Sequence, residues 1–126
     1  MTTPYDASNI FAKIIRGEIP CKEVYRDTQV IAFRDIQPAA ASHVLVLPIG
    51  EYASFDDFVQ KAGQAEVADF FKRVRQIAHD LGLDQSGYRL IMNHGHDASQ
   101  TVPHFHVHLL GGQPLGGLLA ADTLVR

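Results

Sequence analysis

Histidine is concentrated in one short stretch of this 126-residue chain. Five of the seven histidines lie between residues 94 and 108, and three of them, His104, His106 and His108, alternate with apolar residues in the segment HFHVHLL. Alternation with a period of two is typical of a β-strand. The pattern therefore predicts a strand over residues 104–110 that presents the three imidazoles on one face and the intervening apolar side chains on the other.

Three neighbouring imidazoles favour chemistry on a phosphorylated substrate. Like charges in a partly buried site repel one another and lower each other's pKa, so some of these side chains should be neutral near pH 7. A neutral imidazole is a nucleophile and a general base, whereas a protonated neighbour can stabilise phosphate charge or protonate a leaving group. The row of histidines is therefore a candidate catalytic site.

Two alternatives to a catalytic role for these histidines stay open. The histidines could decorate a solvent-facing strand, or a His-x-His pair could present two ligands to zinc. A catalytic zinc needs a third protein ligand, which His43 or His96 could supply. The residues around the strand include Asn93, Gln100 and Thr101 rather than a carboxylate at a set spacing. We therefore predict that there is no metal site and no cofactor, with a His-ligated metallohydrolase as an alternative.

The composition indicates one domain over residues 1–126. Because Cys21 is the single cysteine, the chain can form neither an internal disulfide nor a CxxC pair, which favours a reducing, cytoplasmic setting. The 11 basic and 14 acidic residues give a net charge of −3, which offers no broad positive field for nucleic acid. No apolar run approaches the length of a membrane span. We expect neither a nucleic-acid partner nor a membrane.

The elements that position the histidines follow from periodicity and capping residues. Helical spacing of apolar residues predicts a short helix from an N-cap at Ser8 to about Arg16, and a long helix over residues 64–81 that Gly82 ends. Alternating patterns predict strands over residues 23–26, 30–34, 42–47, 88–93 and 104–110, the first two forming a hairpin. This order favours an α+β fold with helices packed on one side of an antiparallel sheet.

The segment HFHVHLL resembles the His-φ-His-φ-His-φ-φ signature of the histidine triad (HIT) family, where φ is a hydrophobic residue. Further blocks are similar to the Hint branch of that family, especially to its bacterial members; they are NIFAKIIRGEIP, VIAFRDIQPAAASHVLVLP, GYRLIMN and HLLGGQPLG, together with Asn93, Ala98, Gln100 and Val102 at the upstream spacing. The similarity covers about residues 9–119. It implies a five-stranded antiparallel sheet with a long and a short helix, joined in a homodimer as a ten-stranded sheet.

The resemblance also implies an activity and a set of site residues. Members of the Hint branch hydrolyse purine nucleoside 5′-phosphoramidates or adenylated amines to a nucleoside monophosphate of the AMP or GMP type. His106 matches the family's nucleophile, which forms a covalent nucleotidyl-histidine; His104 and His108 flank and orient it, and His43 and Thr101 support catalysis. The implied nucleotide-binding residues are Phe11, Ile14, Phe33, Asp35, Ile36, Asn93, Gln100, Thr101, His106 and His108.

Three departures from the family pattern bear on specificity. Pro103 precedes the triad where an aromatic residue is common, and HDAS at residues 96–99 replaces a more usual glycine pair. The C-terminal segment, about residues 112–126, lacks the tryptophan of animal members; in the family this segment reaches toward the partner subunit's site. The preferred leaving group therefore does not transfer from relatives. A purine nucleotide-binding or regulatory module without turnover is the main functional alternative.

Overall fold

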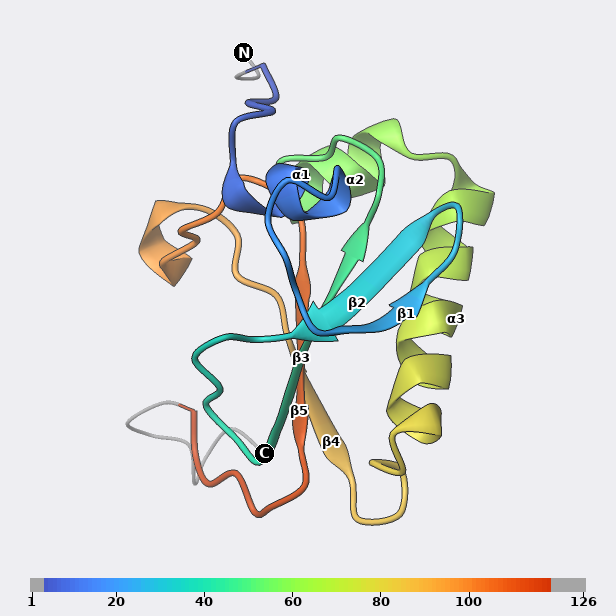
Figure 1. Cartoon of the computed structure of the whole chain (residues 1–126), viewed down its shortest axis with the longest axis vertical. Coiled ribbons are helices and arrows are strands. Elements are labelled where there is room, and N and C mark those ends of the chain that lie inside the picture. The colour runs from blue at the N-terminus through green and yellow to red at the C-terminus, as the bar shows by residue number, and fades with distance from the viewer. Residues whose placement is uncertain (1–3, 119–126) are drawn as a thin grey trace.

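The computed structural model describes residues 4–118, which form a five-stranded antiparallel sheet covered by helices (Figure 1). This confirms the predicted α+β class. Along the chain the elements are α1 (Ile10–Ile15), β1 (Glu23–Arg26), β2 (Val30–Arg34), β3 (Ser42–Pro48), α2 (Phe55–Lys61), α3 (Gln64–Asp80), β4 (Tyr88–Ile91), the 3₁₀ turn η1 (His96–Ala98) and β5 (Val107–Gly111).

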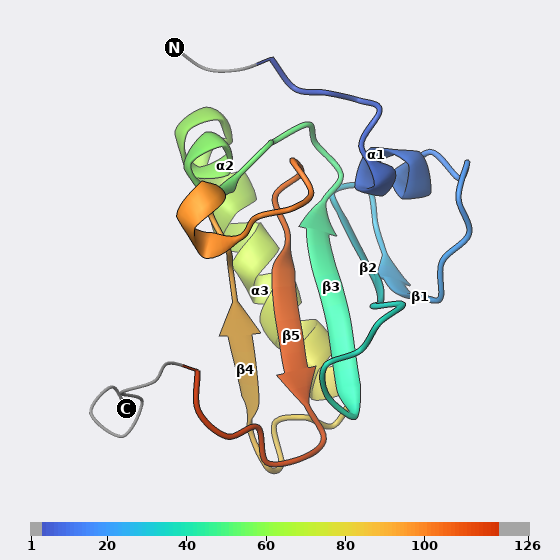
Figure 2. The same cartoon turned by 90° about the vertical axis from the view of Figure 1, so that its left-hand side faces the viewer.

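The strands are ordered β1-β2-β3-β5-β4 (Figure 2), so β3 and β5, which carry His43 and His108, are both interior strands of the sheet. The predicted hairpin is confirmed. The turn between β1 and β2 is stabilised by Asp27, whose Oδ1 accepts hydrogen bonds from the backbone N–H groups of Gln29 at 2.7 Å and Val30 at 2.8 Å. In the centre of the sheet, Leu45 of β3 lies opposite His108 of β5.

Helices cover both faces of the sheet, contrary to the prediction of one side. The central strands carry apolar residues in consecutive positions, such as VIAF in β2, so both of their faces are apolar. Val44, Val107 and their neighbours pack with residues of α2 and α3 on one face. Ile31 and Leu45 pack with residues of α1 on the other. A helix on this second face is required because these side chains would otherwise be exposed to water.

The N-terminus of α1 is capped by Asn9, not by Ser8 as predicted. The Asn9 side chain accepts a hydrogen bond from the Ala12 N–H at 2.9 Å. The Ser8 hydroxyl instead donates to Asp6, which lies before the helix. Serine and asparagine are both good N-caps and these two are adjacent, so the sequence alone did not show which of them caps the helix.

The long helix is confirmed as α3, which ends at Asp80; Gly82 follows with a φ of 74°. Helix α2 was not predicted. It is seven residues long, and its buried Phe58 stacks on Phe105 with ring centroids 4.9 Å apart. A helix of two turns holds too few residues to show a clear periodicity in the sequence. Its position depends on this tertiary contact.

Two strands are shorter than predicted. β4 ends at Ile91 instead of residue 93, and β5 begins at Val107 instead of residue 104. Before β5 the chain bends, because the His104 N–H donates to the Val102 carbonyl at 2.9 Å and the Phe105 N–H to the Tyr52 carbonyl at 2.7 Å. Residues 104–106 therefore lie outside the sheet ladder, and these backbone hydrogen bonds hold them together with side-chain contacts.

Among the described residues no helix is long and apolar enough to cross a membrane. Cys21 is a free, exposed cysteine, and the cytoplasmic setting inferred from it stays a prediction. The C-terminal segment that the family resemblance places near a partner subunit lies largely outside the described residues, since its last eight residues, 119–126, are beyond them.

Candidate active site

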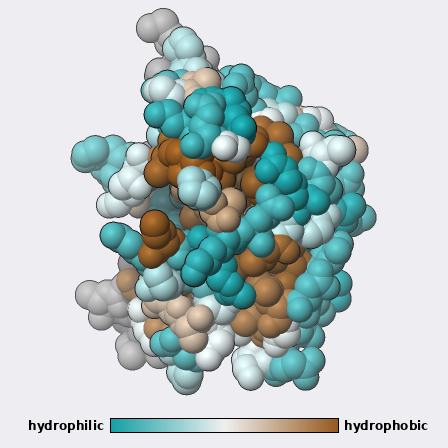
Figure 3. Space-filling model, in the orientation of Figure 1, coloured by the Kyte–Doolittle hydropathy of each residue, from teal (hydrophilic) through white to brown (hydrophobic). Residues whose placement is uncertain are grey.

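A cavity of about 840 Å³ opens on the face of the sheet that carries α1. Figure 3 shows hydrophobic side chains gathered beside α1 around this hollow. The cavity contains every predicted site residue except His104; these are Phe11, Ile14, Phe33, Asp35, Ile36, His43, Asn93, Gln100, Thr101, His106 and His108. They come from α1, from strands β2, β3 and β5 and the segments that adjoin them, and from the segment between β4 and β5.

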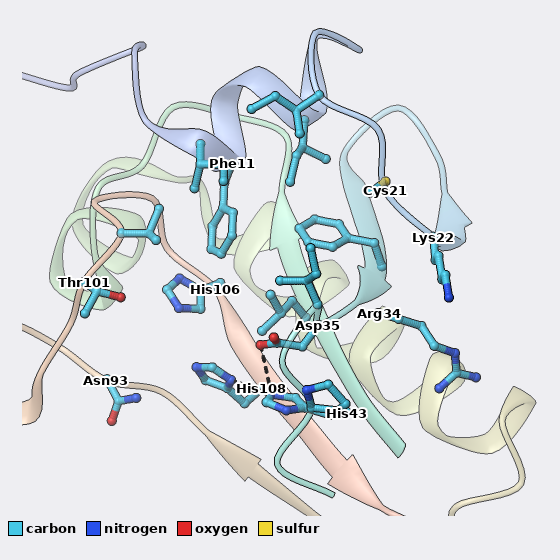
Figure 4. A pocket seen from close by; sticks show the side chains of 18 of the residues that line it. Phe11, Cys21, Lys22, Arg34, Asp35, His43, Asn93, Thr101, His106 and His108 are labelled. Carbon is cyan, nitrogen blue, oxygen red and sulfur yellow. Dashed lines mark hydrogen bonds and ion pairs between the residues drawn. The ribbon is translucent and has the colours of Figure 1, made fainter. Parts of the chain in front are cut away.

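His106 presents one ring nitrogen to the cavity and uses the other to hold its orientation (Figure 4). Its Nδ1 lies 2.7 Å from the backbone oxygen of His104. A carbonyl only accepts hydrogen bonds, so this contact assigns the proton to Nδ1 and leaves the lone pair on Nε2. The ring also contacts Phe11 edge-on, with centroids 4.9 Å apart. His106 is therefore oriented as a nucleophile through Nε2.

His108 is held by a hydrogen-bonded chain that begins at a backbone amide. The Ala39 N–H donates to His43 Nδ1 at 3.0 Å, so the neutral His43 ring carries its proton on Nε2. That Nε2 lies 2.9 Å from His108 Nδ1, to which it donates. The neutral His108 ring therefore carries its own proton on Nε2, and His108 can donate a hydrogen bond through that nitrogen.

Asp35 places a carboxylate beside this chain. Its Oδ2 lies 3.5 Å from His43 Nε2, and its Oδ1 accepts a hydrogen bond from the Gln37 N–H at 2.8 Å (Figure 4). Each carboxylate oxygen has a second lone pair, so both can still accept hydrogen bonds from a ligand. The family resemblance assigned Asp35 and His108 to one nucleotide site, but spacing gave no sign of it, because 73 positions separate them and only the pairing of β2, β3 and β5 brings them together.

Unlike the other two histidines of the triad, His104 does not line the cavity. Its ring is fully buried, with an exposed fraction of 0%. Its Nε2 donates to the Pro48 carbonyl at 2.8 Å, and its Nδ1 lies 2.6 Å from the Tyr5 hydroxyl. Of the three histidines, therefore, only His106 and His108 line the cavity.

Burial keeps the histidines of the site neutral. Desolvation, together with the nearby His106 and His43, lowers the pKa of His108 to about 4. Desolvation also lowers the pKa of His106, although the hydrogen bond to the His104 carbonyl and the charge of Asp35 oppose it. For His43 the same burial lowers the pKa, and Asp35 again opposes the shift. All three imidazoles are therefore uncharged near pH 7, as the sequence predicted for some of them.

The apolar end of the cavity is formed around two aromatic rings. Phe11 of α1 and Phe33 of β2 meet edge-on with centroids 5.7 Å apart, and Ile14 is buried beside them. Ile36 is 95% exposed, so it forms part of the mouth rather than of the buried wall. Cys21 and Lys22 also line this end; they were not predicted, although they directly follow the matched block that contains α1.

The segment between β4 and β5 closes the opposite end of the cavity. Gln100 stabilises this segment with its own amide, because Oε1 accepts from the Gly95 N–H at 3.0 Å while Nε2 donates to the carbonyls of Ala53 at 2.8 Å and Val102 at 3.1 Å. The side-chain amide of Gln100 is thus already hydrogen-bonded within the protein. Asn93 and Thr101 line the cavity with polar groups that can meet a ligand.

Among the residues that the structure describes, one set of potential metal ligands lies in the site, and it includes a carboxylate that sequence spacing did not reveal. Asp35, His43 and His108 each place a ligand atom within 4.8 Å of the others, so a carboxylate does stand near the histidines. However, a metal-binding histidine normally donates its second ring N–H to an acceptor. The second nitrogen of His43 instead accepts a hydrogen bond from Ala39, which keeps the proton on the nitrogen that would bind the metal. These contacts favour a hydrogen-bonded chain of imidazoles over a metal site.

Known proteins share both the sequence pattern and this fold. The HIT domain family matches residues 16–115. A purine nucleoside phosphoramidase from Escherichia coli strain K12 is 45% identical over 115 residues, which is 91% of this chain and 96% of that protein. A histidine triad protein from Clostridium difficile superimposes with a TM-score of 0.80 at 38% identity, covering 90% of this chain and 98% of that one.

A HIT family hydrolase from Legionella pneumophila is also similar, with a TM-score of 0.79 at 38% identity and coverage of 86% of this chain and 100% of that one. The match of the family over most of the chain, the relatives at this identity and the shared fold agree with the geometry of His106 and His108. The chain therefore belongs to the HIT domain family and, at the coarse level that these relatives support, is a hydrolase of that family.

Proposed function

We propose that this protein hydrolyses purine nucleoside 5′-phosphoramidates or adenylated amines, releasing a nucleoside monophosphate of the AMP or GMP type. The observation that carries the proposal is the state of His106: its Nδ1 is bonded to the His104 carbonyl, its burial favours the neutral ring, and its remaining nitrogen is left for the cavity. The E. coli relative is named a purine nucleoside phosphoramidase, which supports the proposal.

The reaction proceeds in two displacements at the α-phosphorus. His106 Nε2 forms a bond to phosphorus while the P–N bond to the amine breaks, and the amine takes a proton from the Thr101 hydroxyl or from His108 as it leaves. The imidazole then carries positive charge, which the Nδ1–H bond to the His104 carbonyl stabilises. In the second step water forms a bond to phosphorus while the P–Nε2 bond breaks, its proton passes to the Thr101 or His108 group that protonated the amine, and His106 is released as a neutral ring.

The nucleotide is held by groups on both sides of His106. Phe11, Ile14 and Phe33 contact the base, and Ile36 covers it at the mouth of the cavity. The Asp35 carboxylate accepts hydrogen bonds from the ribose hydroxyls. The α-phosphate lies near a further set of donors, which are Asn93, Thr101 and His108, with Gln100 stabilising the segment that supports two of them.

Incubation with an adenosine phosphoramidate should release AMP, at a rate that dialysis against EDTA leaves unchanged. The metal independence follows from the protonated Nε2 of His43. Chromatography of the products measures the rate. Binding of the nucleotide without AMP release would favour a purine nucleotide-binding module instead. Loss of activity in EDTA that zinc restores would favour a metallohydrolase built on Asp35, His43 and His108.

We further propose that two chains pair through β4 into a ten-stranded sheet. Within the described residues β4 is hydrogen-bonded only to β5, so its outer edge is free, and Leu90 and Met92 beside that edge are 42% and 41% exposed. Light scattering at micromolar concentration should give a mass near twice the 13.9 kDa of one chain. A mass near 13.9 kDa would contradict the dimer.

A further inference from the structure

The position of His106 depends on what holds the His104 carbonyl. Residues 104–106 precede the ladder of β5, so no strand pairing fixes this peptide. The Phe105 N–H of this peptide donates to the Tyr52 carbonyl at 2.7 Å. The His104 ring provides the second anchor, bonded on one side to the Pro48 carbonyl at 2.8 Å and on the other to the Tyr5 hydroxyl at 2.6 Å. Because Nε2 of His104 donates to a carbonyl, Nδ1 is the acceptor and the Tyr5 hydroxyl is the donor.

Tyr5 also connects this anchor to the helix that forms the wall of the cavity. The Tyr5 oxygen accepts a hydrogen bond from Asn9 Nδ2 at 2.9 Å, and the same Asn9 side chain caps α1 through the Ala12 N–H at 2.9 Å. Helix α1 carries Phe11, whose ring contacts His106 with centroids 4.9 Å apart. One hydroxyl group thus links two of the contacts that orient His106.

We propose that Tyr5 is a positioning residue for the reaction, holding His106 through the His104 backbone and through α1. Tyr5 does not line the cavity and touches neither the proposed nucleotide nor the proposed nucleophile. Loss of its hydroxyl leaves the buried Nδ1 of His104 without a donor, so the peptide that accepts the His106 proton can shift. The effect falls on the attack geometry and therefore on kcat, while the base and ribose contacts that set KM are retained.

The kinetic test, which rests on the proposed function, compares Tyr5→Phe with Tyr25→Phe. Tyr25 is a matched control because its hydroxyl also donates to one side chain, Asp27 at 2.5 Å, while its ring packs against the core on the face of the sheet opposite the cavity. We expect Tyr5→Phe to lower kcat about tenfold or more and to change KM less than about threefold, as for a lost orienting hydrogen bond. Tyr25→Phe should match the wild type. Equal kcat in all three proteins, or equal losses in both variants, would overturn the proposal.

A second readout needs no substrate. Long-range ¹H–¹⁵N NMR spectra of the imidazoles identify which nitrogen of His106 is protonated, and we expect the Nδ1–H tautomer in the wild type and in Tyr25→Phe. Tyr5→Phe should show a mixture of tautomers or a shifted Nδ1 resonance. If the wild type does not hydrolyse the phosphoramidate, the proposed function is wrong, and the NMR spectrum alone then tests the positioning role of Tyr5. An unchanged His106 spectrum in Tyr5→Phe would overturn the positioning role.

Discussion

Replacing His106 by alanine is expected to abolish hydrolysis and to leave nucleotide binding largely intact. The expected loss is roughly 10⁴-fold or greater in kcat, because no other imidazole in the described cavity combines a free Nε2 lone pair with a fixed ring orientation. His43 and His108 are both engaged in the chain that begins at Ala39. Calorimetry with AMP should give a Kd near that of the wild type, since the base and ribose contacts lie on other elements.

The variants His43→Ala and His108→Ala provide the comparison. Each removes an orienting or donating group and should cost on the order of 10²-fold to 10⁴-fold, less than the loss of the nucleophile. Intact-protein mass spectrometry of the wild type, quenched early in turnover, should show one added nucleotidyl group that is absent from His106→Ala. Turnover by His106→Ala above about a hundredth of the wild-type rate would exclude His106 as the nucleophile.

Sequence predicted the elements of this fold where a long periodic pattern or a good turn residue supported them. The hairpin of β1 and β2, the strand β3 and the helix α3 all lie within a residue or two of their predicted bounds. The predictions were wrong where a tertiary contact decided the outcome. α2 depends on the packing of Phe58 against Phe105, and α1 lies on the second face of the sheet because β2 and β3 are apolar on both.

The site was predictable to the extent that the strand period governs it. Alternation correctly placed His106 and His108 on one face, opposite Val107 and Leu109 of the core. It did not reveal that His104 is fully buried outside the cavity, where the hydrogen bonds of residues 104 and 105 to Val102 and Tyr52 bend the chain before the ladder begins. Sequence spacing also gave no indication of the contact between Asp35 and His43, which only the pairing of strands creates.

The burial of His104 predicts that the protein loses stability as the pH falls from about 6.5 to about 4. Desolvation lowers the pKa of this ring from 6.5 to about 4, opposed by the hydrogen bond to the Pro48 carbonyl. Above pH 6.5 the ring is neutral in the folded and the unfolded chain, so its contacts contribute fully. Between these two pH values the unfolded chain binds a proton that the folded chain does not, so the free energy of unfolding decreases.

For His104 alone this decrease is on the order of 3 kcal/mol. His43, His106 and His108 act in the same direction, since burial lowers the pKa of each. The partly buried carboxylates whose pKa is lowered, those of Asp27 and Asp57, lose their contribution mainly below pH 3.8 and so fall outside this range. The pKa values of Asp6 and Glu18 are also lowered, but these side chains are exposed to water, so they contribute little.

The test is urea unfolding of the wild type and His104→Gln at a series of pH values from about 7.5 to about 4. Glutamine can donate to the Pro48 carbonyl and accept from Tyr5 without a titrating ring, so its free energy of unfolding should depend less on pH. Tyr25→Phe, which leaves every imidazole in place, should keep the wild-type slope. Parallel curves for the wild type and His104→Gln would mean that His104 binds its proton equally well in the folded and the unfolded chain, and therefore that its ring is not held neutral between Pro48 and Tyr5.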